Sequence, residues 1–388
     1  MTFYTTLYSH RNAIPTSLYE FNIASHRDCV TPYSLLTSTP MASPITSSSS
    51  RHNIVFTLPR TSSNLLIQIL NLPAQTGVHR HTSDGYMFLP PLIQRFKNHL
   101  AGKDVNTWTE EERHGISEAF QTAYLALEAW IGEAEKVGEV VFIKEHINWL
   151  IDPIAETRFL HGKEHSIEED IFTIRPTSTS SHSPPSRTKL KDKDNETCLP
   201  DSVLNRFIPT ILIRNPLLTI PSQLRTSIDN EGLEAALSTP LEQWRWETSF
   251  HWSRSLYTYY SSLPISSRKA SVQGTEYPII LDADDLPKQG LMKRYAQSVG
   301  LNDEVLRFEW DVASQEDVEK MGKTERRMRD TLLASRGIVG GKTAHGLSVE
   351  GERDKWRNEF GDELAERVEL LVKEGMGDYE WLWERRFR

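Results

Sequence analysis

Short apolar runs alternate along this chain with longer segments in which apolar residues recur every three or four positions. Four such runs lie at 53–58, 139–143, 209–213 and 277–281. Runs of this length, bounded by turn residues, are typical of buried strands, and the periodic segments between them are typical of helices. The pattern predicts an α/β fold in which helices cover both faces of a central parallel sheet.

The longest periodic segment, 108–135, predicts an amphipathic helix with one apolar stripe. A second predicted helix, at about 241–262, is dense in aromatic residues such as Trp244 and Trp252. These rings either pack against the sheet or form the flat walls of a pocket, and their spacing fits both interpretations.

Residues 1–52 are rich in Ser, Thr and Pro and lack periodicity, so we expect a disordered tail. Met41 is an alternative to Met1 as the start of translation. Residues 175–200 have the composition of a flexible insertion rather than of a domain boundary. We therefore expect one domain over 53–388.

The bulk composition narrows the function classes. The net charge of −9 and the pI of about 5.8 argue against a broad nucleic-acid-binding surface but leave room for a local basic pocket. The two cysteines, Cys29 and Cys198, make a disulfide framework or a structural zinc site unexpected. Because the chain also lacks a membrane-spanning run and the apolar stretch of a secretory signal, we expect a cytoplasmic protein.

The turn after the first apolar run carries the first candidate site. Pro59 ends the run, and the following residues lead directly into a helical pattern. Such a turn aims backbone N–H groups and a helix N-terminus at one point, which suits a phosphate or sulfate. An ordinary strand-to-helix turn with a Ser or Thr cap explains the pattern equally well. The candidate anion-binding residues are Arg60, Thr61, Ser62, Ser63 and Asn64.

Lys144 and His146 form a second candidate site after the second run. Residues two apart at a strand end point the same way and can reach one ligand. His146 suits a general base because its unperturbed pKa lies near neutrality, and Lys144 can neutralise charge on a leaving phosphate. A surface lysine and a hydrogen-bonded loop histidine are the alternative.

Arg214 and Ser222 form a third candidate site, at the end of the third run and in the helix that follows. A forked guanidinium and a hydroxyl placed in this way can hold a phosphate monoester. A salt bridge and a helix-start serine are the structural alternative. Ligands of parallel sheets bind beyond the carboxyl ends of the strands, so we expect the three sites to form one anion pocket.

Asp282, Asp284 and Asp285 follow the fourth run. Carboxylates at a strand end can bind Mg²⁺, orient a cationic substrate or activate a nucleophile. Asp284 and Asp285 are therefore candidate catalytic residues. They can equally cap the next helix, where acidic residues are favoured.

In combination, these residues resemble the PAPS-dependent sulfotransferases, whose three-layer, P-loop-like α/β fold binds 3'-phosphoadenosine 5'-phosphosulfate (PAPS). Segment 58–66 looks like the family's 5'-phosphosulfate loop, and 144–146 is similar to its catalytic Lys-Thr-His segment. Arg214 and Ser222 match the spacing of the pair that holds the 3'-phosphate. Segment 335–342 loosely resembles a late, basic, glycine-containing segment of the family. The similarity to uncharacterised fungal sulfotransferase-like proteins is particularly close.

The resemblance implies sulfuryl transfer from PAPS to a small-molecule hydroxyl or amine in fungal secondary metabolism, without a metal. Two departures affect the donor site. Ser62 stands where the family's loop usually has glycine, and Glu145 places a carboxylate between Lys144 and His146.

Two alternative functions remain open at this point. One is a redirected member of the same fungal group, such as an arginine-containing cyclodipeptide synthase that uses aminoacyl-tRNA. The Asp284-Asp285 pair fits its cationic amino acid, whereas the acidic net charge counts against tRNA. The other is a catalytically inactive, nucleotide-binding homologue. The oligomeric state is left open.

Overall fold

The computed structural model describes residues 51–81, 84–162, 167, 170–176, 190–268 and 275–388. The expected tail up to residue 50, with Cys29 and Met41, lies outside the described residues, as do residues 177–189 of the expected insertion.

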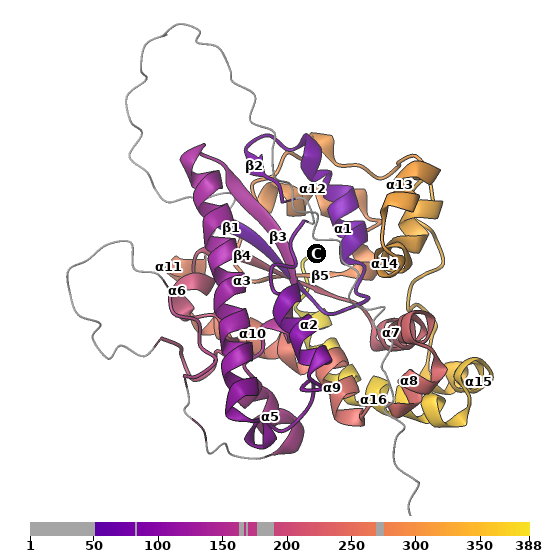
Figure 1. Cartoon of the computed structure of the whole chain (residues 1–388). Helices are drawn as coiled ribbons and strands as arrows, with labels where there is room; N and C mark the ends of the chain where they lie inside the picture. Colours follow the sequence, from indigo (N-terminus) through magenta and orange to yellow (C-terminus); the bar gives the residue numbers. More distant parts are fainter. Residues whose placement is uncertain (1–50, 82–83, 163–166, 168–169, 177–189, 269–274) are drawn as a thin grey trace, which may run out of the picture.

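A five-stranded, all-parallel sheet lies at the centre of the protein (Figure 1), in the order β2-β3-β1-β4-β5. The predicted parallel α/β fold is therefore confirmed, and it is consistent with a P-loop-like architecture. The two-residue strand β2 was missed because so short a segment has no periodicity. The strands are β1 (His52–Thr57), β2 (Val78–His79), β3 (Val140–His146), β4 (Phe207–Ile213) and β5 (Ile279–Asp282).

The middle strand β1 brings the ends of its neighbours together. Thr57, the last residue of β1, pairs with His146 of β3 on one side and with Leu212 of β4 on the other. Because all three strands are parallel, the segments that follow them begin at one edge of the sheet.

The alternation of side chains along β1 separates two cores. Ile54 and Phe56 pack on one face of the sheet, and Val55 packs on the other. Helices α1 (Ser63–Leu70) and α12 (Gln289–Ser298) cover the Val55 face. The opposite core is formed with α2 (Leu89–Lys97), α3 (Glu110–Lys136), α4 (Ile147–Leu150), α5 (Pro153–His161), α6 (Asp201–Leu204) and α10 (His251–Ser262).

A third apolar cluster joins helices from the second half of the chain. Leu224 and Trp356, for example, are buried in it. Its helices are α7 (Pro216–Glu231), α8 (Leu233–Ser238), α9 (Leu241–Thr248), α15 (Val349–Phe360) and α16 (Asp362–Glu384). The remaining α-helices are α11 (Ile265–Arg268), α13 (Gln315–Lys320) and α14 (Lys323–Ala334). The short 3₁₀-helices are η2 (Leu72–Ala74), η3 (Val105–Thr107), η4 (Ala283–Asp285) and η5 (Asp303–Val305).

The single helix expected at 241–262 is two helices, α9 and α10. Ser249 interrupts it, because its extended backbone ends α9 while its hydroxyl oxygen accepts a hydrogen bond of 3.2 Å from the N–H of His251. The aromatic residues there are mostly core: Trp246 and Trp252 are both fully buried. Trp244 is also buried but lines a cavity.

The described end of the expected insertion, residues 190–200, contacts residues elsewhere in the chain. Lys191 forms an ion pair of 2.8 Å with Asp152, and the N–H of Cys198 donates to the Leu150 carbonyl at 2.7 Å. Such contacts to distant residues cannot be read from composition.

Among the described residues, no helix is long and apolar enough to cross a membrane.

Candidate functional site

A cavity of about 1320 Å³ lies where the segments after β1, β3 and β4 meet. It brings together most of the candidate residues, including Lys144 with His146 and Arg214 with Ser222. Thr61 and Asp285 do not line it. The candidates that do are Arg60, Ser62, Ser63, Asn64, Lys144, His146, Arg214, Ser222 and Asp284.

In the turn after β1, two non-glycine residues have the positive φ angles that glycine adopts most readily. Ser62 has φ 67° and ψ 27°, a left-handed conformation that favours glycine, and Arg60 has φ 66°. A non-glycine residue held in this region costs about 1 kcal/mol or more, and such strain is concentrated at functional sites. Thr61 is buried and donates to the Leu58 carbonyl at 2.8 Å, so it holds the turn from within. Ser62 thus adopts the backbone conformation that a glycine at this position would favour.

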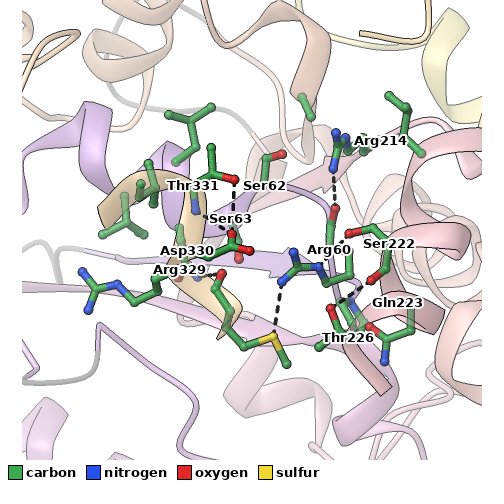
Figure 2. A pocket seen from close by; sticks show the side chains of 18 of the residues that line it. Arg60, Ser62, Ser63, Arg214, Ser222, Gln223, Thr226, Arg329, Asp330 and Thr331 are labelled. Atoms are coloured by element: carbon green, nitrogen blue, oxygen red, sulfur yellow. Dashed lines mark hydrogen bonds between the residues drawn. The ribbon is translucent and has the colours of Figure 1, made fainter. Parts of the chain in front are cut away.

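Arg60, Arg214 and Ser222 converge at one end of the cavity (Figure 2). Arg60 Nε donates to Ser222 Oγ at 3.0 Å, and Arg214 Nη1 donates to the Arg60 carbonyl at 3.1 Å. Neither arginine forms an ion pair with any described residue. Burial is the largest cause that lowers the pKa of each guanidinium, to about 10 for Arg60. Two partly buried cations without a carboxylate contact among the described residues make this end of the cavity suited to an anion.

The late segment 335–342 closes the same end of the cavity. All of its residues line the cavity, and the Lys342 carbonyl accepts from Arg214 Nη2 at 3.4 Å. Helix α14 adds Met328, whose sulfur accepts from Arg60 Nη1 at 3.3 Å. Arg329 of this helix also lines the cavity, whereas Arg327 is paired with Asp229 and Asp330.

Lys144 and His146 project from one side of β3, as expected for residues two apart in a strand. Lys144 Nζ donates to Asn64 Oδ1, which links β3 to the turn after β1. The ammonium group also lies 4.6 Å from the centre of the Tyr86 ring. The two expected donor-site segments are therefore in direct contact.

The imidazole of His146 is held in place by a residue that sequence analysis missed, Thr57. The Thr57 hydroxyl lies 2.6 Å from His146 Nδ1 and donates to the Glu145 carbonyl at 3.3 Å. Because the proton of the Thr57 hydroxyl points at that carbonyl, the hydroxyl oxygen accepts a hydrogen bond from Nδ1–H of His146. The lone pair of the neutral imidazole is then on Nε2. Burial, and then the charge of Lys144, lower the pKa of His146 to about 3. The ring is consequently neutral at neutral pH, as a general base must be before it takes a proton.

Two aromatic rings beside His146 were also missed. The ring centres of Tyr86 and Trp149 lie 4.9 Å and 4.6 Å from that of His146. Gly85 permits this arrangement, because a Cβ there would lie 2.1 Å from the Lys144 carbonyl oxygen. Asn148 lines the same cavity, is 1% exposed, and has no described hydrogen-bond partner for its amide. No local motif signals these residues, because the loop before α2 reaches β3 only in the folded protein.

Glu145 faces away from Lys144 and His146. It is fully buried, and its Oε1 accepts a hydrogen bond of 2.5 Å from the N–H of Met87. Burial is the largest cause that raises the pKa of Glu145, to about 8. The carboxyl group is therefore protonated at neutral pH, and it adds no negative charge to the site.

Replacing Glu145 by glutamine should change how stability depends on pH. The folded protein keeps the Glu145 proton up to about pH 8, whereas the unfolded chain loses it near 4.5. Stability of the wild type therefore falls with rising pH between these values. Glu145→Gln should raise the melting temperature by about 5 °C at pH 8 to 9 and have little effect near pH 5. Glu133→Gln, at an exposed position of α3, is the control; an equal gain at both pH values would contradict the assignment.

The aspartates after β5 each have a partner within the protein. Asp282 accepts from the N–H of Asp284 at 2.8 Å and from the Tyr379 hydroxyl at 2.9 Å, and it caps η4. Asp285 is paired with Lys288 and Arg386. Asp284 lines the cavity and accepts from the N–H of residue 344 at 2.8 Å. Within the described residues, no cluster of three or more His, Cys, Asp or Glu side chains could hold a metal ion.

Two curated proteins are similar to this chain over most of its length. Sulfotransferase ppzF of Metarhizium majus (strain ARSEF 297) is 36% identical over 346 residues, which are 87% of this chain and 97% of that protein. Sulfotransferase ppzF of Metarhizium rileyi (strain RCEF 4871) is 35% identical over 336 residues, which are 85% of this chain and 94% of that protein. No protein-family model and no solved structure matches the chain.

Proposed function

Because this chain belongs to the fungal sulfotransferase family of the two Metarhizium proteins, we propose that it transfers a sulfuryl group from PAPS to a hydroxyl or amine of a small molecule in secondary metabolism. The family makes it a transferase. The observation that carries the donor assignment is the convergence of two partly buried arginines, neither ion-paired with a described residue, with Ser222 at the carboxyl ends of β1 and β4.

The donor carries one anionic group at each end of its ribose, and the residues present fit both. Arg214, Ser222 and the guanidinium of Arg60 hold the 3'-phosphate, since Arg60 Nε donates to Ser222 Oγ and Arg214 Nη1 donates to the Arg60 carbonyl. The backbone N–H groups of the turn, with Ser63 and Asn64, hold the 5'-phosphosulfate at the start of α1. When bound, the donor supplies a sulfuryl group on a phosphate leaving group.

His146 takes the proton from the acceptor at Nε2, which its pairing with Thr57 leaves free. Lys144, held by Asn64, places its charge where the leaving oxygen becomes more negative. Catalysis then comes mainly from positioning and electrostatics rather than from a covalent intermediate. Asp284 and Asp285 receive no catalytic role, because hydrogen bonds and ion pairs within the protein occupy them.

A thermal-shift measurement with the product nucleotide, 3',5'-adenosine diphosphate, tests the donor site. A ligand at one hundred times its dissociation constant stabilises the folded state by about 2.7 kcal/mol, so a clear rise in melting temperature is expected. Adenosine 5'-monophosphate, which lacks the 3'-phosphate, is the matched control and should stabilise the protein less. Absence of a shift with the diphosphate would contradict the proposal.

Activity assays distinguish the two alternative functions from sulfuryl transfer. An inactive homologue binds the diphosphate but releases none from PAPS with any acceptor. A tRNA-dependent synthase loses its activity on addition of RNase, whereas sulfuryl transfer continues.

A further inference from the structure

The cavity extends along α7 beyond the anion-binding end. Ser222 is followed on this helix by Gln223 and, two turns later, by Glu231, and all three line the cavity. At 1.5 Å per residue, Glu231 lies about 14 Å along the helix from Ser222. Glu247 of α9 lines the same part of the cavity. We call Gln223, Glu231, Trp244 and Glu247 the carboxylate compartment.

The two carboxylates of this compartment have no cationic partner among the described residues. Among the described residues, Glu247 accepts hydrogen bonds only from neutral amides, from Gln223 Nε2 at 3.0 Å and from Gln243 Nε2 at 3.1 Å. The side chain of Glu231 forms no hydrogen bond or ion pair within the described part of the chain. Burial, and then the nearby charge of Glu247, raise the pKa of Glu231 to about 7. Two partly buried carboxylates that repel one another are stabilised by a cation placed between them.

Unpaired polar atoms in the same compartment give independent evidence of a ligand. Trp244 is only 4% exposed, yet its indole N–H has no hydrogen-bond partner among the described residues. The Gln223 Oε1 atom is buried and also lacks a partner there, although the amide nitrogen of the same side chain is bonded to Glu247. Figure 2 shows Gln223 directly beside Ser222. Buried polar atoms of folded proteins normally have partners, so these two indicate contact with a bound molecule.

An apolar wall connects this compartment with the proposed catalytic histidine. Leu89, Leu92, Ile93 and Phe96 of α2 line the cavity over two helical turns, a length of about 10 Å. Before α2 begins, the Tyr86 ring lies 4.9 Å from the His146 ring, and at the other end of the helix the Phe96 ring lies 6.1 Å from the Trp246 ring of α9.

We propose that the acceptor carries a cationic nitrogen, an amine or guanidinium, which binds between Glu231 and Glu247 while an apolar part of the molecule lies along α2. The hydroxyl or amine that receives the sulfuryl group then lies at His146. This inference rests on the proposed function, since it assigns the acceptor class of the same cavity. Selectivity comes from the carboxylate pair, because a neutral or anionic acceptor leaves both carboxylates unpaired.

Four phenols that differ only in the group at the far end test the proposal: 4-(2-guanidinoethyl)phenol, tyramine, 4-ethylphenol and 3-(4-hydroxyphenyl)propanoate. Their binding to the full chain is measured by calorimetry in the presence of 3',5'-adenosine diphosphate. We expect the two cationic probes to bind at least about tenfold more tightly than 4-ethylphenol, and the anionic probe to bind most weakly.

Glu231→Gln is expected to remove most of this tenfold preference while leaving the affinity for 3',5'-adenosine diphosphate unchanged. Glu352→Gln is the matched control, because Glu352 lines the same cavity but is paired with Lys355 at 2.6 Å. Melting temperatures of the free variants establish that each is folded.

Equal affinity for cationic and neutral probes would overturn the acceptor assignment, as would a preference that survives in Glu231→Gln. Failure of the cationic probes to bind at millimolar concentration, in a protein that binds the diphosphate, would overturn it as well. The proposed function stands in each of these cases. It fails separately if the diphosphate itself does not bind.

Discussion

Replacing His146 by alanine should lower turnover by about 10²- to 10⁴-fold, the range expected for loss of a general base. The affinity for 3',5'-adenosine diphosphate should change by no more than about twofold, because the phosphate-binding contacts come from the turn after β1, from Arg214 at the end of β4 and from Ser222 of α7. Turnover is measured as release of the diphosphate from PAPS with an acceptor identified by screening, and affinity is measured by calorimetry.

Thr57→Val is the matched control for this variant. It removes the hydrogen bond to His146 Nδ1 but keeps the imidazole, so turnover should fall much less than in His146→Ala. A collapse of nucleotide binding in His146→Ala would show that the histidine supports the donor site rather than the proton transfer.

Replacing Arg214 by alanine should weaken binding of 3',5'-adenosine diphosphate by about 100-fold. That factor corresponds to about 3 kcal/mol, which is the size expected for charge-assisted hydrogen bonds from a partly buried guanidinium to a phosphate. The variant also loses the contact to the Arg60 carbonyl, so part of the effect comes from a less ordered turn. Calorimetric titration of the folded variant measures the change.

Arg225→Ala controls for the loss of one positive charge from the cavity. Arg225 lies on the same helix as Ser222 and lines the same cavity, but Glu359 occupies its guanidinium at 2.5 Å and 2.8 Å. Its removal should change nucleotide affinity by less than about threefold. Equal losses in the two arginine variants would mean that the cavity attracts the nucleotide by its overall charge and not through Arg214.

The architecture of the sheet could be predicted because it depends on local chain properties. Buried parallel strands are short and apolar throughout, and the helices between them repeat with a period near 3.6, so both are visible in sequence order. The prediction of one helix at 241–262 was wrong because a contact outweighs the local pattern there. Ser249 divides the aromatic helix through a single hydroxyl contact.

The amino-acid sequence was sufficient to indicate the parallel α/β sheet, the family resemblance, and the residues at the carboxyl ends of its strands, because those residues follow strands directly. Their mutual contacts depend on which strands are neighbours, and folding alone places Arg214 against Arg60 and Thr57 against His146. The protonation of Glu145 and the pairing of the aspartates after β5 likewise depend on burial and on partners about sixty to one hundred positions away. Contacts and burial depend on the three-dimensional positions of residues, so they arise only when the chain folds.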